Sequence, residues 1–261
     1  MKCPAIRLLR QKLAAEEPTY GLWVTLESAS VTEMAVMAGL DFVVIDAEHG
    51  QLDWQDILQH LRATARSNTV ALVRVAELNG GLIKRSLDLG ADGVVIPWVE
   101  TAEQLRQAIS WSRYPTAGLR GIGAERATAW GQGLVEHAAE ADEHVLVVPI
   151  IETVRTLRQV ALMAEVEGSE LFWFGPADYS STAGYRGQWE GPGVAEQILQ
   201  MKETLRRAKK HCGLLTTSHD DLLKRREQGF RLLGLGSDAG LLIRSLRGAL
   251  SVVGRDQPWK L

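Results

Sequence analysis

Residues 42–75 read FVVIDAEHGQLDWQDILQHLRATARSNTVALVRV and contain one complete unit of strand, helix and strand. The runs FVVID (42–46) and ALVRV (71–75) are short, rich in β-branched residues and almost continuously apolar. Such runs are typical of strands that helices cover on both faces. The segment between them has helical spacing, so this unit predicts two parallel strands of a larger sheet.

The same unit recurs along the whole chain. We expect eight strands, at 21–26, 42–46, 71–75, 93–97, 145–151, 171–175, 213–217 and 231–236. Eight helices are expected near 30–39, 53–66, 79–89, 101–112, 153–164, 193–211, 219–229 and 238–251. Strict alternation predicts an α/β fold in which residues 1–261 form a single (β/α)8 TIM barrel. The long intervals 113–144 and 176–192 are expected to be loops on the C-terminal face of this barrel.

The composition indicates a protein that acts on small molecules. The 261 residues are 46% hydrophobic, and 29 basic residues against 32 acidic ones give a formal net charge of −3. This charge leaves no field that attracts nucleic acid or an anionic membrane. We find neither a signal peptide nor a membrane-spanning stretch. The two cysteines, Cys3 and Cys212, form no CxxC pair, which fits a reducing cytoplasm.

Ionisable residues follow several of the predicted strands. They are Asp46, Glu48, His49, Arg74, Glu152 and Asp178. Each of them alone could be an ordinary loop charge or a helix cap. In a barrel, however, the C-terminal ends of all strands meet at one face, so we expect these side chains to converge on a common site.

Glu152 and Asp178 follow consecutive strands and are candidate metal ligands. Together they could offer two oxygen ligands to one divalent cation and leave positions for water and substrate. The same two carboxylates could instead act as the acid and the nucleophile of a glycosidase. We favour the metal site, and the glycosidase alternative stays open.

Arg74 and His49 add a cation and a base to the predicted site. A charged side chain within ALVRV is costly to bury, so Arg74 should face a substrate anion or form an ion pair with Asp46 or Glu48. His49 is suited to general-base catalysis near neutral pH. No lysine falls in a predicted strand, which argues against a Schiff base. An enolate formed here would need a metal and Arg74 to hold its charge.

Several longer segments resemble the HpcH/HpaI family of metal-dependent class II aldolases. They are GLWVTLES (21–28), AGLDFVVIDAEHG (38–50), LVRV (72–75), IKRSLDLGADGVVIPWVETAEQ (83–104), RYPTAGLRGIG (113–123), IIET (150–153) and FGPADYS (174–180). The likeness runs along nearly the whole chain. The spaced combination of segments is far more specific than any one of them.

The resemblance implies a carbon–carbon lyase that acts on a small keto acid and an aldehyde. Such an enzyme cleaves or forms 2-keto-4-hydroxy acids through a pyruvate enolate. By this likeness Glu152 and Asp178 bind Mg²⁺, Mn²⁺ or Co²⁺, and Arg74 stabilises the enolate oxygen. His49 is then the general base, and Asp88 raises its basicity.

The resemblance also implies how the substrate is held and how the chains assemble. Ala177 and Asp178, with the backbone of the GPAD turn (175–178), hold the substrate carboxylate, while Trp23 and Leu215 lie along the pocket. The expected assembly is a homo-oligomer, a hexamer, in which the last helix (238–251) is exchanged between neighbours.

Two residues depart from a simple transfer of these roles. Asp88 falls near the C-terminal end of the predicted helix 79–89, which lies toward the face of the barrel opposite the site. Either this helix boundary is wrong or the residue acts from elsewhere in the oligomer. Ile150 occupies the position of the family's usual glutamine, so substrate specificity does not carry over. Two alternatives remain: a citrate-synthase-like condensation of oxaloacetate with acetyl-CoA in siderophore biosynthesis, and a non-catalytic barrel that binds a keto acid.

Overall fold

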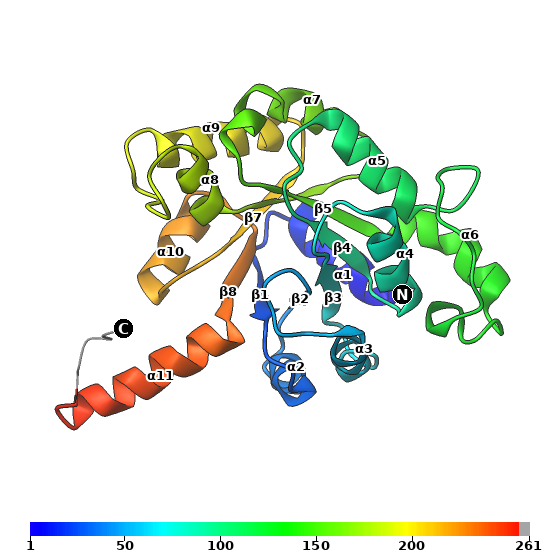
Figure 1. The fold of residues 1–261 in the computed structure, drawn as a ribbon, viewed down its shortest axis with the longest axis horizontal. Coiled ribbons are helices and arrows are strands. Elements are labelled where there is room, and N and C mark those ends of the chain that lie inside the picture. Colours follow the sequence, from blue (N-terminus) through cyan, green and yellow to red (C-terminus); the bar gives the residue numbers. More distant parts are fainter. Residues whose placement is uncertain (256–261) are drawn as a thin grey trace.

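The computed structural model describes residues 1–255 and contains a closed barrel of eight parallel strands (Figure 1). In barrel order the strands are β1 (Thr19–Val24), β2 (Phe42–Asp46), β3 (Val70–Arg74), β4 (Gly93–Ile96), β5 (Leu146–Ile151), β6 (Leu171–Phe174), β7 (His211–Leu215) and β8 (Leu232–Ser237). Parallel pairing of β8 with β1 closes the ring. The predicted (β/α)8 fold is confirmed, with strand boundaries that differ by up to two residues.

Helices surround the barrel and follow the predicted alternation. They are α2 (Ala29–Met37), α3 (Trp54–Ala63), α4 (Gly80–Asp88), α5 (Ala102–Ser112), α7 (Val160–Ala164), α9 (Val194–Arg207) and α10 (His219–Glu227). Side-chain caps begin several of them. Asp53 accepts from the backbone N–H of Asp56, and Thr101 accepts from that of Gln104, each within a capping box.

Alternate residues of each strand pack on opposite faces of the barrel wall. Phe42 and Val44 of β2 belong to the cluster inside the barrel, whereas Val43 and Ile45 belong to the cluster between the strands and the helices. Both faces are buried, which explains why the strand sequences are continuously apolar. The next inward-facing residue of β2 after Val44 is Asp46, at the C-terminal end of the strand.

A helix that the sequence analysis did not predict, α1 (Cys3–Ala14), closes the N-terminal end of the barrel. Its buried residues Ile6, Leu9 and Leu13 join the inner cluster, which includes the first residues of several strands. The charged residues that interrupt its apolar pattern, such as Arg7, lie on the exposed face of an amphipathic helix.

The segment 113–144 is not a loop on the C-terminal face, and that expectation was wrong. It follows α5 and precedes β5, so it leads to the N-terminal end of the barrel. It contains η1 (Arg126–Thr128) and the helix α6 (Leu134–His144). The helical signal of α6 was weak because only Ala141 and His144 of this helix are buried.

Two further predictions needed correction near the C-terminal face. Residues 153–164 form a 3₁₀ helix, η2 (Val154–Arg158), followed by the short α7, instead of one helix. The expected loop 176–192 begins with the short helix α8 (Pro176–Thr182). Pro176 fits the first turn of a helix because that position needs no N–H donor.

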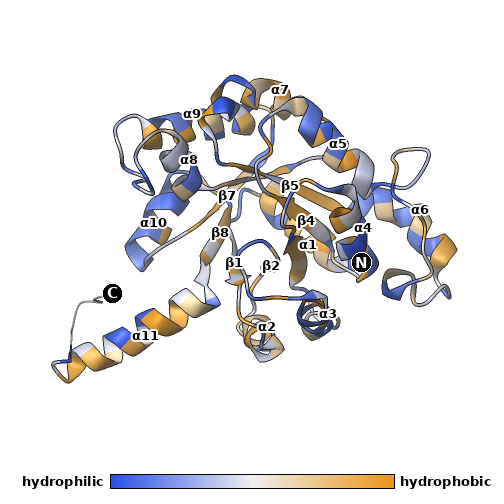
Figure 2. Ribbon diagram, viewed as in Figure 1, coloured by the Kyte–Doolittle hydropathy of each residue, from blue (hydrophilic) through white to orange (hydrophobic). Residues whose placement is uncertain are grey.

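The last helix, α11 (Asp238–Val252), extends away from the barrel (Figure 1). Asp238 is its one buried residue, and apolar residues recur along the rest of the helix (Figure 2). The exposed apolar side chains are Leu241, Leu242, Ile243, Leu246, Leu250 and Val252. None of the helices within residues 1–255 is long and apolar enough to span a membrane. The predicted domain range ends at 261, so its residues 256–261 lie outside the described part of the chain.

The close approach of β4 and β5 generates a first prediction. A Cβ atom at Gly93 would lie 2.2 Å from the backbone oxygen of Leu146, so Gly93→Ala should lower the free energy of unfolding by about 3 kcal/mol. Urea unfolding measures the difference. At Gly121 a Cβ would meet nothing closer than 3.8 Å, so Gly121→Ala should change stability by less than about 0.5 kcal/mol. Equal stability of the two variants would contradict this packing.

Candidate active site

Three buried polar side chains continue the inner face of the barrel at the C-terminal ends of its strands. Asp46 ends β2, Arg74 ends β3 and Glu152 follows β5. The inward-facing apolar residues two positions earlier are Val44, Leu72 and Ile150. Because side chains alternate along a strand, the three polar groups point toward the barrel axis above an apolar layer.

Asp46 organises one side of this polar layer. Its Oδ1 accepts hydrogen bonds from Nε of Arg74 (2.9 Å) and from the backbone N–H groups of Glu48 and His49 (3.0 and 3.1 Å). Its Oδ2 accepts from Nη2 of Arg74 and from Nε1 of Trp23 (3.0 Å). Burial raises the pKa of Asp46, but Arg74 and the backbone amides outweigh burial and hold the pKa below its ordinary value. The carboxylate is therefore charged at neutral pH.

Arg74 is paired with both neighbouring acids. Besides Asp46, its Nη1 lies 2.7 Å from Oε2 of Glu48, without the angle of a hydrogen bond. The guanidinium carbon lies 5.1 Å from the ring centroid of Trp23. The ion-pair interpretation of Arg74 is thus confirmed. A guanidinium has five N–H donors, so Arg74 keeps donors for a further oxygen after these contacts.

Glu152 occupies the other side of the polar layer, 3% exposed. Its Oε1 accepts from the backbone N–H of Trp98 at 2.6 Å. Trp98 has a φ of 53°, a left-handed conformation that is uncommon for a bulky residue and that aims this N–H at the carboxylate. Burial raises the pKa of Glu152, and the charges of Asp178 and Glu48 add to this effect. The N–H of Trp98 and the charge of Arg74 oppose it, and the resulting pKa is about 7.

The donor set around Glu152 fits a divalent cation. Asp178, in the first turn of α8, and Glu48 both repel the charge of Glu152. Arg74 is already paired with Asp46 and Glu48, and within residues 1–255 neither Glu152 nor Asp178 has a basic partner. Neighbouring carboxylates without a counter-charge are the ligands that hard cations prefer.

Gly175 leaves the room that the Glu152 side chain occupies. A Cβ atom at Gly175 would lie 2.7 Å from Oε2 of Glu152 and 3.3 Å from Cγ2 of Ile150. Any larger residue at this position would displace one of the two side chains. The glycine of the FGPADYS segment is therefore needed for its close approach to the carboxylate.

The other predicted residues occupy different positions around the polar layer of Asp46, Arg74 and Glu152. Trp23, the last residue but one of β1, belongs to the inner cluster, Leu215 ends β7, and Ala177 is exposed in the first turn of α8. His49 lies at the rim, with 68% of its side chain exposed and Nε2 3.7 Å from Oε1 of Glu48. Their roles stay predictions.

Asp88 is not brought to His49 within one chain. It is the last residue of α4, and its Oδ1 accepts from Nη2 of Arg120 at 2.8 Å. Helices of a barrel run antiparallel to the strands, so the C-terminal end of α4 lies toward the face opposite the site. Of the two explanations for Asp88, the wrong helix boundary is excluded, because α4 extends to this residue as predicted.

Sequence reasoning underestimated three contributors to the site. Asp46 and Glu48 were expected at the site, but pairing with Arg74 was the one role given to them, whereas Asp46 also positions Trp23, and Glu48 raises the pKa of Glu152. The period-two pattern of FVVID contains a signal for Asp46, because residues 42, 44 and 46 share a face. The backbone N–H of Trp98 left no signal in the sequence.

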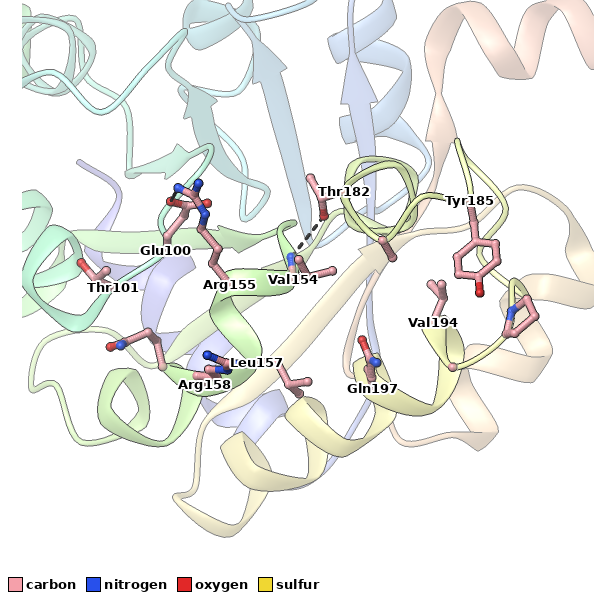
Figure 3. Close-up of a pocket in the computed structure, with 14 residues that line it drawn as sticks. Glu100, Thr101, Val154, Arg155, Leu157, Arg158, Thr182, Tyr185, Val194 and Gln197 are labelled. Atoms are coloured by element: carbon pink, nitrogen blue, oxygen red, sulfur yellow. Dashed lines mark hydrogen bonds and ion pairs between the residues drawn. The ribbon is translucent and has the colours of Figure 1, made fainter.

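A cavity of about 920 Å³ lies beside this site, between η2, α8 and α9 (Figure 3). In it the backbone N–H of Val154 donates to Oγ1 of Thr182 (3.1 Å), and Arg155 pairs with Glu100 (3.3 Å). Neither Glu152 nor any of its charged neighbours lines this cavity. The carboxylates face the barrel axis instead, so this hollow is separate from them.

The fold and the site together define a (β/α)8 barrel protein with a carboxylate-rich centre beside a guanidinium that Asp46 and Glu48 hold in place. Residues 19–245 match the sequence profile of the family described as HpcH/HpaI aldolase/citrate lyase, and the chain belongs to this family.

Individual relatives agree with this assignment. Hydroxypyruvate/pyruvate aldolase of Pseudomonas aeruginosa is 34% identical over 93% of this chain and 91% of its own length. The crystal structure of an HpcH/HpaI aldolase/citrate lyase family protein from Burkholderia cenocepacia J2315 superimposes with a TM-score of 0.90 and 31% identity, over 94% of this chain and 98% of that one. The citrate synthase SbnG superimposes with a TM-score of 0.83 and 28% identity, over 95% and 97% of the two chains.

The raised pKa of Glu152 predicts how the metal-free protein responds to pH. Between its ordinary value of 4.5 and about 7, the folded state holds a proton on Glu152 that the unfolded state has lost. Glu152 therefore makes the protein less stable as pH rises from 5 to 7.5. In EDTA, Glu152→Gln should reduce the decrease in unfolding free energy between pH 5 and pH 7.5 by about 1–3 kcal/mol. Urea unfolding at both pH values measures this difference.

The control for this measurement is Glu103→Gln on α5, where 82% of the side chain is exposed. This variant should keep the pH dependence of the parent protein. If Glu152→Gln also keeps it, Glu152 is ionised in the metal-free folded state and its environment is not the one described.

Proposed function

We propose that this protein is a divalent-metal-dependent aldolase that cleaves or forms 2-keto-4-hydroxy acids through a pyruvate enolate. The observation that carries the proposal is the convergence of Arg74 with the carboxylates of Glu152 and Asp178 at one end of the barrel. The aldolase relative and the family membership support it. Mg²⁺, Mn²⁺ or Co²⁺ held by Glu152 and Asp178 would polarise the carbonyl and carboxylate oxygens of the keto acid.

The residues of the chain divide the remaining work. Arg74, fixed by Asp46, donates its free N–H groups to the carbonyl oxygen and stabilises the charge of the enolate. Backbone N–H groups at Ala177 and Asp178 hold the carboxylate, because the first N–H groups of a helix have no intrahelical partner. Trp23 and Leu215 line the pocket.

Cleavage begins with a proton transfer at the rim of the site. His49 removes the proton from the 4-hydroxyl group, and that oxygen becomes the carbonyl of the departing aldehyde. The electrons of the C3–C4 bond pass into the enolate beside Arg74. Protonation at C3 then yields pyruvate. The exposure of His49 suits a base that meets the aldehyde half of the substrate.

Exchange of the pyruvate methyl protons in D2O tests the enolate step without knowledge of the aldehyde. We expect exchange, followed by NMR, with Mg²⁺, Mn²⁺ or Co²⁺ and none with EDTA. Glu152→Gln and Asp178→Asn should each slow it at least about hundredfold, because each removes a charged ligand. Glu196→Gln, on the exposed face of α9, should exchange at the parental rate. Absence of exchange with every metal would exclude the pyruvate aldolase.

The citrate-synthase-like condensation is the second candidate, because the citrate synthase SbnG shares this fold at 28% identity. It predicts citrate from oxaloacetate and acetyl-CoA, with free CoA released in proportion and no need for an aldehyde. A non-catalytic barrel would bind keto acids without any proton exchange.

We propose that the protein works as a homo-oligomer, a hexamer, in which α11 packs on a neighbouring chain. The exposed apolar side chains of α11 and its position away from its own barrel support this assembly. In such an assembly Asp88 acts on His49 of a neighbouring chain, since the two lie apart within one chain. The free thiols of Cys3 and Cys212 support a cytoplasmic location.

Substitutions that place charged residues on α11 test this assembly. The double substitution Leu242→Glu and Leu246→Glu places charges where apolar side chains are 54% and 52% exposed. Burial of these charges in an interface is costly, so sedimentation should show smaller species than for the parent protein. Arg247→Glu, an exposed charge reversal on the same helix, should leave the assembly intact. An unchanged size for the double variant would contradict the proposed role of α11.

A further inference from the structure

The layer directly beneath the carboxylates is apolar at the position of Ile150. Ile150 and Glu152 are two residues apart on the same face of β5. The position that a Cβ atom would take at Gly175 lies 2.7 Å from Oε2 of Glu152 and 3.3 Å from Cγ2 of Ile150. An Ile150 methyl group therefore borders the carboxylate that is the candidate metal ligand.

Two aromatic side chains continue this apolar surface. The rings of Trp23 and Trp173 lie 4.9 Å apart between centroids, and both residues are buried in the same inner cluster as Ile150. The side chain of Leu215 packs against this cluster from β7. Trp23 has one polar atom, Nε1, and this atom already donates to Asp46. Ile150, Leu215 and Trp23 thus offer no free hydrogen-bonding group to a molecule that lies above them.

The chemistry of a 2-keto acid complements this division into a polar and an apolar wall. The carboxylate and the C2 carbonyl are its polar edge, and they match Arg74 and the cation that Glu152 and Asp178 would hold. The carbon at C3, where the enolate reacts, is its apolar end. It fits the wall of Ile150 and Leu215, since apolar surface gains by leaving water.

We propose that Ile150 sets the donor specificity of the aldolase, favouring keto acids with hydrogen or alkyl at C3 over those with a hydroxyl there. This inference rests on the proposed function. A C3 hydroxyl buried against Ile150 loses its hydrogen bonds to water and finds no partner. Apolar pockets discriminate against a hydroxyl isostere by up to about hundredfold. We expect a preference of about ten- to hundredfold.

The test compares 2-oxobutyrate with hydroxypyruvate, which differ only by a methyl or a hydroxyl on C3. Exchange of the C3 protons in D2O gives kcat/KM for each acid with whichever metal supports pyruvate exchange. The metal-only rate of each acid, measured without protein, corrects for its intrinsic acidity. After this correction 2-oxobutyrate should be favoured about ten- to hundredfold. Equal corrected values, or a preference for hydroxypyruvate, would overturn the proposal.

Substitution of Ile150 tests the same proposal without a correction for the reactivity of the acids. The intrinsic reactivity of each acid is the same for every variant, so it cancels when the ratios of two variants are compared. Ile150→Gln supplies an amide, so the ratio of 2-oxobutyrate to hydroxypyruvate should fall about tenfold or more. Ile150→Leu keeps an apolar wall of the same volume and should keep the ratio. An unchanged ratio in a folded Ile150→Gln protein would overturn the proposal. If this variant does not fold, the parent ratio alone decides.

Pyruvate exchange separates failure of this inference from failure of the proposed function. If the parent protein exchanges pyruvate but shows no preference between the two larger acids, Ile150 does not set the donor specificity and the aldolase stands. If it exchanges none of the three acids with any metal, both proposals fall together.

Discussion

The ion pair between Asp46 and Arg74 is the interaction on which the rest of the site depends. A guanidinium at the end of an interior strand is costly unless an anion compensates it, and Asp46 supplies that anion through two hydrogen bonds. The pair also holds Trp23 and the backbone that leads to His49. One carboxylate thus connects β1, β2 and β3 at the mouth of the barrel, and the orientation of Arg74 does not have to be established by the substrate.

The two halves of the C-terminal end of the barrel, around Asp46 and around Glu152, differ in how far their charges are balanced. Around Asp46 the charges are balanced, because Arg74 and backbone amides compensate the carboxylate. Around Glu152 they are not, because Asp178 and Glu48 add negative charge, which the N–H of Trp98 and the charge of Arg74 offset only in part. A balanced half gives a rigid framework, and an unbalanced half suits the cation that we propose there. The asymmetry arises because the acid at the end of β2 lies beside the arginine at the end of the adjacent β3, whereas, within residues 1–255, the acid after β5 has no basic residue at the end of an adjacent strand.

Much of this architecture could be predicted from the sequence, for reasons that differ between elements. Interior strands such as FVVID have a strong signal because both faces are buried, and barrel geometry then brings Arg74 and Glu152 to one end. By contrast, α1 was missed because its charged face interrupts the apolar pattern, and α6 because it buries little. The left-handed backbone of Trp98 depends on tertiary contacts, which no local pattern contains. Within its own chain Asp88 pairs with Arg120, so its predicted effect on His49 cannot be derived from the contacts of one chain.

The first and last strands meet at the closure of the barrel, where β1 pairs with β8 and Asp238 accepts hydrogen bonds from Thr25 and Leu26. During synthesis, β1 leaves the ribosome more than two hundred residues before these partners exist. The edge of β1 therefore remains unpaired for most of translation, and the ring forms only when nearly the whole chain has emerged. Contacts of such long sequence separation slow folding, so the apolar strands made first wait longest for the barrel that buries them.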